Sequence, residues 1–235
     1  MTAEESGMAR SELGRSGFVL RRIGLVLAGA ALAAFALLSV WYGGRAAWSD
    51  ASSLQSRWLV SQWRAGEGPA SSEAQWVEVR ADLQAALQTS PDNAQLLDDL
   101  GFLNASRAQA LGTPAAGSPA QQMQQDLLSE AVASYRAAAR LRPTFPYTWA
   151  YLALAKHRHG EQDAELWLAF DKALHYGHAE AGVHPALAEI AFARWGALGA
   201  ERQARFKAMA ATSPAATRKH LLEMATRSGV ELSAR

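Results

Sequence analysis

The sequence contains no cysteine in its 235 residues. This absence excludes disulfide bonds, thiolate metal ligands and a cysteine nucleophile, although it does not fix the compartment, because many periplasmic proteins also lack cysteine. The chain has little net charge either, since 23 Lys and Arg against 22 Asp and Glu give +1. No global excess of positive charge therefore indicates a nucleic acid partner. Hydrophobic residues make up 49% of the chain, which is enough for a packed core.

Motifs of catalysis and cofactor binding are also absent. The chain has no G-x-S-x-G, H-E-x-x-H, G-x-x-x-x-G-K-[ST] or G-x-G-x-x-G sequence. His157 and His159 lie two residues apart and would point in different directions on a helix. His175 and His178 lie three apart, where a helix is expected to end, so neither pair suits joint metal ligation. The sequence predicts no metal, no cofactor and no enzymatic activity.

A long uncharged run stands near the N-terminus. Ile23–Tyr42 is 20 residues without a charged side chain, and at about 1.5 Å per residue such a helix crosses a hydrocarbon core of about 30 Å. Trp41 and Tyr42 close the run as an interfacial aromatic pair. Positive side chains precede it at four positions, namely Arg10, Arg15, Arg21 and Arg22. Only Arg45 and Arg57 fall within the next twenty residues.

This charge distribution predicts the topology of the anchor. By the positive-inside rule, residues 1–22 form a cytoplasmic tail, residues 23–42 span the membrane, and the C-terminal domain lies on the other side. A cleaved signal peptide is the alternative. Its apolar region would be only about 7–15 residues long, and the sequence after the run offers no clean A-x-A cleavage site. We therefore expect an uncleaved, single-pass anchor.

Residues 43–72 are expected to form a juxtamembrane helix and a linker. Leu54 and Trp58 lie one helical turn apart, as do Leu59 and Trp63. Such aromatic residues would pack on the domain or at the lipid headgroups, and a platform that stacks on carbohydrate is the alternative. The stretch 66–72, rich in Gly, Pro and Ser, breaks the helix and is the best linker candidate.

The most informative stretch is 131–160, where two predicted helices meet at a turn that contains prolines. In the first helix, Ala131, Tyr135 and Ala138 share a face on which the small residues admit a neighbouring helix and the tyrosine fills the remaining gap. Pro143 cannot continue that helix, whereas Pro146 suits the first turn of the next. The pattern predicts a helix–turn–helix unit.

Similar patterns continue on both sides of this stretch. Helices are expected over 73–89, over 94–110 and from about 122 to 141, followed by a hairpin that opens at Pro146 and ends at 175–177. Between the second and third helices stands an insertion, 111–121, with two prolines and two glycines. It either faces a partner or is a flexible bridge.

Degenerate helical hairpins and a cap are expected over residues 178–235. Apolar residues predict helices over 183–197 and 201–211. Ser213 is expected to cap a last helix that has Pro214 at its first position, and Gly229 to end it.

The small–aromatic–small face, the proline stop and a new helix that opens on an aromatic residue resemble the tetratricopeptide repeat (TPR), a unit of about 34 residues. The resemblance covers residues 73–177. It implies an all-α fold, in which a TPR-like solenoid of helical hairpins follows one transmembrane helix. The insertion 111–121 departs from the family, in which a short turn joins the two helices.

The resemblance also implies a concave groove lined by the first helix of each repeat. Transferred position by position, it gives Gln95, Asp98, Phe102 and Ala105 from one unit, and Tyr147, Ala150, Tyr151, Leu154, His157 and Arg158 from the next. The candidate partner-binding residues among them are Asp98, Phe102, Tyr147, Tyr151, Leu154, His157 and Arg158. They would hold a peptide segment or stack on sugar rings. The alternative is that neighbouring helices cover them in so small an array.

Basic residues concentrate around the same stretch, at Arg136, Arg140, Arg142 and Lys156. They form either a solvated face or a docking patch for an acidic partner, an anionic glycan or a lipid headgroup. The pair Asp98 and Asp99 is expected to be solvated.

A narrower resemblance concerns the run RLRPTFPYTWAYLALAKHRHG, followed by D-A-E and an F-D-K-A-L helix. It is similar to the VpsP-like polysaccharide biosynthesis proteins, which are membrane-anchored TPR proteins of bacterial extracellular-polysaccharide loci. This implies a non-enzymatic scaffold of the bacterial inner membrane, with a periplasmic domain that contacts protein partners and possesses no catalytic residues. The alternatives are a glycan-binding periplasmic module and a TPR adaptor of a pilus, secretion or cell-division complex.

Overall fold

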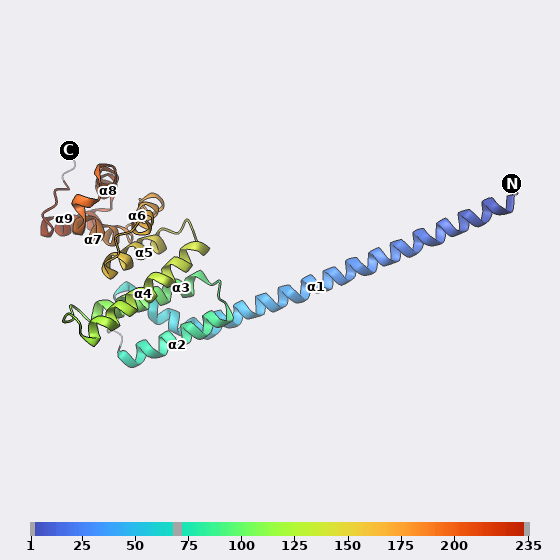
Figure 1. Cartoon of the computed structure of the whole chain (residues 1–235), viewed down its shortest axis with the longest axis horizontal. Coiled ribbons are helices and arrows are strands. Elements are labelled where there is room, and N and C mark those ends of the chain that lie inside the picture. Colours follow the sequence, from blue (N-terminus) through green and yellow to red (C-terminus); the bar gives the residue numbers. More distant parts are fainter. Residues whose placement is uncertain (1–2, 68–71, 233–235) are drawn as a thin grey trace. The chain divides into compact units, whose positions relative to one another are not determined.

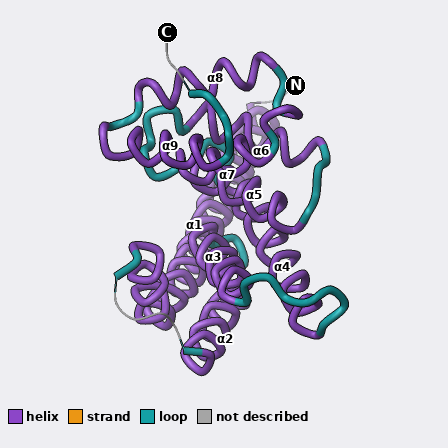
Figure 2. Tube along the Cα trace, turned by 90° about the vertical axis from the view of Figure 1, so that its left-hand side faces the viewer, coloured by secondary structure: helices purple, strands orange, loops and turns teal. Residues whose placement is uncertain are grey.

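The computed structural model describes the backbone of residues 3–67 and 72–232, and the side chains of Leu25 and of described residues from 27 onward. Within these ranges the regular structure is entirely helical, without strands (Figure 2). The all-α prediction is therefore confirmed for the described part of the chain. Contacts divide the chain into two units, Met1–Ala51 and Ser52–Arg235, and each is described separately.

The first unit consists of the greater part of helix α1 (Ala3–Ala65). Its large apolar side chains are exposed, among them Leu25, Leu27, Leu32, Phe35, Leu37, Leu38, Val40, Trp41 and Tyr42. By length and composition this is one helix that could span a membrane, and its most apolar window lies unburied by the rest of the chain. The side chains of the expected cytoplasmic tail, residues 1–22, lie outside the described residues.

The second unit begins with the last turns of α1, which pack on α2 (Glu73–Thr89) and α3 (Ala94–Ala110). Val60 is fully buried there, and Leu59 and Trp63 pack against the same cluster. Leu54 and Trp58, in contrast, are 67% and 58% exposed. Of the two Leu–Trp pairs in the juxtamembrane stretch, one therefore packs on the domain and the other is exposed. α1 ends at Ala65, and residues 68–71 of the expected linker lie outside the described residues.

Local capping explains where the next helices start. Ser72 and Gln75 form a reciprocal capping box at the start of α2, and the Asn93 side chain caps α3. The bounds of both helices agree with those expected from the sequence. α4 (Pro119–Leu141) starts three residues earlier than expected, because Ser118 caps it and Pro119 occupies its first turn. The insertion is correspondingly shorter than the predicted 111–121.

Two helices complete the region of the TPR resemblance, α5 (Pro146–His159) and α6 (Ala164–Tyr176). Gly160, at φ +90°, provides the left-handed residue that ends α5, and Asp163 caps α6. α3 packs on α4, α4 on α5 and α5 on α6 (Figure 1). These helices thus pack in chain order, and a TPR arrangement of them stays a prediction.

The last helices are α7 (His184–Ala193), the 3₁₀ turn η1 (Trp195–Ala197), α8 (Ala200–Thr212) and α9 (Ala215–Arg227). Here the chain order of packing is lost, since α7 contacts α5 and α9 more extensively than α8. The helix expected over 183–197 is divided between α7 and η1. Pro214, and not Ser213, is the residue before α9, because the Ser213 hydroxyl is engaged by His184 and by the carbonyl of Met209.

The largest hydrophobic cluster extends from α4 to the residues after α9. Its α4 side includes Ala131 and Tyr135 from the face predicted from the sequence, and Ala138, the third residue of that face, is also buried. The Tyr135 ring meets α3 at Gly101, where an added Cβ would lie 2.8 Å from the ring. Only glycine at this position lets the tyrosine approach α3 so closely.

Candidate functional site

The α3–α5 groove lies between two helices that present the same residue spacing to each other. α3 contributes Phe102, Ala105, Ser106 and Gln109, and α5 contributes Tyr151, Leu154, Ala155 and Arg158. Offsets of three, four and seven residues place each set on one helix face. The hollow that they enclose has a volume of about 150 Å³ and is lined mainly by apolar surface.

The floor of the groove is the buried side chain of Tyr135, from α4. Its ring stacks on that of Tyr151, with centroids 5.9 Å apart and planes inclined by 23°. Burial raises the pKa of the Tyr135 phenol, so this side chain stays neutral and offers the groove an uncharged aromatic surface. Two aromatic rings are thus fixed in position before any ligand binds.

The rim beside α1 is held by Arg64. Its guanidinium carbon lies 4.9 Å from the centroid of the Phe102 ring, a cation–π distance. The same guanidinium donates a 3.0 Å hydrogen bond to the buried carboxylate of Asp99. Burial raises the pKa of Asp99, while the charge of Arg64 acts in the opposite direction. Phe102 is therefore fixed by a residue from another helix.

Arg158 closes the other end of the groove. Its Nε and Nη2 groups donate to the two carboxylate oxygens of Glu189, each at 2.8 Å, and its Nη1 donates to the Gln109 side chain at 3.0 Å. A guanidinium has five N–H groups. The described partners engage three of them, so hydrogen-bonding capacity remains at this end of the groove.

A hollow of about 240 Å³ adjoins the groove and shares Gln109 and Arg158 with it; we call it the polar hollow because three of its six lining residues have polar side chains. Its other walls come from α4 and from the start of the insertion. The Gln124 amide donates to the carbonyls of Ala108 and Gly112, both at 2.9 Å, and so fixes the insertion where it leaves α3. Because both amide hydrogens are used, the Gln124 side-chain oxygen is the acceptor that this residue still offers.

Four of the seven predicted partner-binding residues line this groove: Phe102, Tyr151, Leu154 and Arg158. The sequence reasoning missed Ser106, Gln109, Tyr135 and Ala155 as lining residues. Ser106 and Gln109 lie four and seven positions after Phe102, and Ala155 lies four after Tyr151, so helical spacing was the signal for these three. Tyr135 had been interpreted only as a residue that fills the gap between helices.

Asp98 does not belong to the groove, and the expectation of a solvated Asp98–Asp99 pair is wrong. Both side chains are buried. The Asp98 carboxylate accepts from the Thr148 hydroxyl at 2.9 Å and pairs with Arg142. Burying a charge is favourable only when partners replace its hydration, and Asp98 obtains them from residues more than 40 positions later in the chain.

Tyr147 and His157 also lie outside the lining of the groove. The Tyr147 hydroxyl donates to Glu180 at 3.2 Å, and its ring packs against Gly182, both in the loop after α6. His157 accepts a 2.8 Å hydrogen bond from Arg194. Burial and the charge of Arg194 lower the pKa of His157, so its imidazole is kept neutral. Both residues join α5 to elements that follow it.

The four basic residues do not form the exposed patch that the sequence suggested. Arg136 makes a bidentate pair with Glu165, at 2.6 and 2.7 Å, and Arg142 pairs with Asp98. Lys156 is 0% exposed. Only Arg140 among the four is exposed. The reason is that carboxylates from other parts of the chain neutralise the rest.

The buried Lys156 holds the turn between α5 and α6. Its ammonium pairs with Glu161 and lies 2.9 Å from Asp163 and 2.8 Å from Glu165. Burial disfavours the charge, but hydrogen bonds to the three carboxylates outweigh this effect and raise the pKa of Lys156. Hydrogen bonds from Arg136, and then from Lys156, lower the pKa of Glu165 to about 2. Lys156 therefore has a structural role, and its buried ammonium is not accessible to a partner.

Among the described residues, no group of three or more His, Asp or Glu side chains could hold a metal ion. No protein-family model matches the chain, and neither the curated proteins nor the solved structures contain a match to it. The TPR and VpsP-like resemblances therefore stay predictions. The α3–α5 groove is the feature from which a function can be inferred.

Proposed function

We propose that this protein is a membrane-anchored scaffold whose helical domain holds a segment of another cell-envelope protein in the α3–α5 groove. The observation that carries this proposal is the pair of matched helix faces, which leave a preformed, mainly apolar hollow over the Tyr135 ring. Concave apolar sites with a few convergent polar groups are the usual places for ligands. The apolar α1 helix supplies the anchor.

The hollow suits one large apolar side chain. An apolar cavity of about 150 Å³ in another protein binds benzene, and the α3–α5 groove has a similar volume. Phe102, Tyr151 and Leu154 would surround such a side chain, with Tyr135 beneath it. Burying an apolar side chain there contributes about 1.5–3 kcal/mol, and anchors of this kind dominate the affinity of many interfaces.

The polar end suits the backbone of the same segment. Arg158 retains N–H groups beyond those that bind Glu189 and Gln109, and Gln124 retains an acceptor oxygen. A peptide carbonyl and a peptide N–H are the complementary groups. An extended segment would therefore place its apolar residue in the groove and its next peptide unit in the polar hollow. This combination favours a polypeptide as the occupant.

The setting that the VpsP-like resemblance implies completes the proposal. The protein would act without catalysis, with its C-terminal domain in the periplasm, and would organise the machinery of extracellular polysaccharide biosynthesis or export. An adaptor of a pilus, secretion or cell-division complex would use the groove in the same way. A glycan-binding module would instead stack sugar rings on Tyr151 and Phe102.

Site-specific photo-crosslinking tests the proposal in living cells. A photoreactive phenylalanine analogue replaces Ser106, which lines the groove, or Met123, which is 51% exposed on α4 and does not line it. We expect the Ser106 position, and not the Met123 position, to capture one defined segment of an envelope protein. The captured peptide should carry a large apolar residue at the crosslink.

A blocking variant makes the result specific to the groove. Ala105→Trp fills the hollow, so it should abolish the Ser106 adduct while the full-length protein keeps its helical circular dichroism spectrum. An adduct that persists in this variant, or equal capture from Met123, would show that the groove is not the binding site. If purified polymer perturbs the protein and no segment is captured, the glycan-binding alternative replaces the scaffold.

A further inference from the structure

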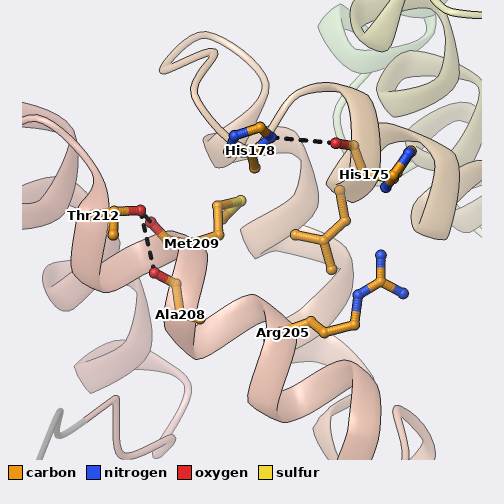
Figure 3. Close-up of a pocket in the computed structure, with 7 residues that line it drawn as sticks. His175, His178, Arg205, Ala208, Met209 and Thr212 are labelled. Carbon is orange, nitrogen blue, oxygen red and sulfur yellow. Dashed lines mark hydrogen bonds between the residues drawn. The ribbon is translucent and has the colours of Figure 1, made fainter.

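A second hollow, separate from the α3–α5 groove, lies between the end of α6, the loop that follows it, and α8. We call it the α6–α8 hollow (Figure 3). Its volume is about 390 Å³. Leu174 and Met209 are buried and give it an apolar base. Neither the TPR resemblance nor the proposed scaffold role gives this place a function.

Three of the four polar side chains around this base carry nitrogen, and the fourth is the hydroxyl of Thr212. His175 comes from the last turn of α6, His178 from the loop, and Arg205 from α8, and none of the seven lining residues is a carboxylate. Figure 3 shows the Arg205 guanidinium extending from α8 toward the side of the hollow where His175 lies. Three side chains from three segments are thus brought around one space, although they are separated by up to 30 positions in the sequence.

The hydrogen bond of His178 determines which of its ring nitrogens can bind a ligand. Its Nδ1 lies 3.3 Å from the carbonyl oxygen of His175. A carbonyl only accepts, so Nδ1 carries the hydrogen and Nε2 is the nitrogen that gains a proton as the pH falls. Protonation therefore places a new N–H donor on the ring.

Arg205 brings a positive charge that its neighbours balance only in part. The nearest carboxylate is Asp171, whose two oxygens already accept from Arg202 at 2.9 and 2.8 Å. Arg205 lies 3.8 Å from the same carboxylate, which is beyond hydrogen-bond distance. One carboxylate is shared between two guanidinium groups, so the site has an excess of positive charge.

The other charged groups on the surrounding elements do not reverse this balance. They are Glu165, Asp171 and Lys172 on α6, Glu180 in the loop, His184 and Glu189 on α7, and Glu201, Arg202 and Lys207 on α8. Glu165 binds Arg136 and Lys156, Glu189 binds Arg158, and the exposed Glu201 is outnumbered by the three cations of α8. Glu180 accepts a hydrogen bond from Tyr147, and burial lowers the pKa of His184. At the end of α8, the Thr212 hydroxyl bonds to the Ala208 and Met209 carbonyls, so helix acceptors there are partly covered.

We propose that the α6–α8 hollow binds a small oxyanion, a phosphate or carboxylate group of a small molecule, through Arg205, His175 and His178. Arg205 supplies the permanent charge and a planar pair of donors, the geometry that suits oxyanions. The two histidines add charge and donors when their rings are protonated.

Histidine-selective NMR on the full-length protein in detergent micelles tests this, with inorganic phosphate as the probe. We expect phosphate to shift the His175 and His178 ring signals and to raise the pH at which they titrate. His220, exposed on α9 outside the hollow, is the internal reference. Arg205→Gln should weaken binding at least about tenfold, because it removes a charge-assisted contact. Lys207→Gln, which removes an exposed charge from the same helix, should change it less than about twofold.

The outcomes separate a built site from diffuse attraction. Equal responses of His220, His175 and His178 overturn the proposal, as does an equal loss of affinity in Lys207→Gln and Arg205→Gln. If Arg205→Gln fails to fold, His178→Gln takes its place and should weaken the binding of phosphate. Acetate in the same titration distinguishes the source of the oxyanion. Stronger binding of phosphate assigns a phosphate group, and stronger binding of acetate assigns a carboxylate.

Discussion

Replacing Gly101 by alanine probes the contact on which both the fold and the groove depend. The added Cβ would lie 2.8–2.9 Å from three carbon atoms of the Tyr135 ring, closer than real Cβ contacts. The ring has no free direction in which to move, because it is buried and stacked on Tyr151. The methyl group therefore forces α3 away from α4 or tilts the floor of the groove.

The size of the effect is a balance of two terms. Overpacking a well-packed core costs about 1–3 kcal/mol, whereas alanine is favoured over glycine inside a helix by about 1 kcal/mol. We expect Gly101→Ala to lower the free energy of unfolding by up to about 2 kcal/mol, or the melting temperature by up to about 6 °C for a domain of this size. Gly196→Ala is the control, because nothing lies within 4 Å of its added Cβ.

Thermal and urea unfolding of the full-length protein in detergent measures both variants. The double variant Gly101→Ala/Tyr135→Leu identifies the cause, because removing the ring should cancel the cost of the methyl group and make the two changes non-additive. A Gly101→Ala protein that melts higher than the wild type would refute the reasoning. It would show that the ring yields and that the groove floor is not rigid.

Three further substitutions test the local interactions. Glu165→Gln weakens the network with Arg136 and Lys156 and should cost about 2 kcal/mol at pH 7, measured by urea unfolding, after allowance for partial exposure. The pKa of Glu165 is about 2 in the folded protein, below its ordinary 4.5. The stabilisation is therefore complete above pH 4.5 and is lost as the pH falls toward 2. The variant should lose less stability than the wild type over that range. Ser118→Ala removes the cap of α4 and should cost about 1 kcal/mol, seen as a lower melting temperature. Gly160→Ala forces a side chain into a left-handed conformation and should cost about 1–2 kcal/mol in urea unfolding.

For each of these three substitutions, one result would contradict the prediction. Equal acid sensitivity of Glu165→Gln and the wild type would mean that the ion pairs do not persist in solution. An unchanged melting temperature for Ser118→Ala would place the start of α4 after residue 119, nearer the sequence-based expectation. Unchanged stability of Gly160→Ala would show that α5 can end without a left-handed residue.

The helices were largely predictable because their signals are local. Apolar spacing, prolines and capping residues determine where α2 and α3 begin and end, and the structure agrees with those bounds. The start of α4 at Pro119 could also have been predicted, because Ser118–Pro119 is a capping serine followed by a proline in the first turn. Ser213–Pro214 has the same form. In that second dipeptide the prediction that Ser213 caps α9 was wrong, because the Ser213 hydroxyl is engaged by His184, 29 positions earlier.

The site was predictable only in part because its details depend on distant partners. The TPR resemblance placed Phe102, Tyr151 and Leu154 at groove-facing positions. The burial of Asp98 depends on Thr148, 50 positions away, and no local pattern signals it. The burial of Lys156 was easier to predict from the sequence, because carboxylates follow it at offsets of five, seven and nine residues. Such clustering favours an internal ion pair over an exposed basic patch.

The most direct test of the central claim is the affinity of the purified full-length protein for the segment captured at Ser106. Phe102→Ala removes a wall of the α3–α5 groove, and Leu141→Ala removes an equally apolar but exposed side chain on α4 that does not line it. We predict that Phe102→Ala weakens binding at least about tenfold, as expected for an interface anchor, while Leu141→Ala binds like the wild type. Equal affinities of the wild type and Phe102→Ala would contradict the assignment of the groove as the binding site.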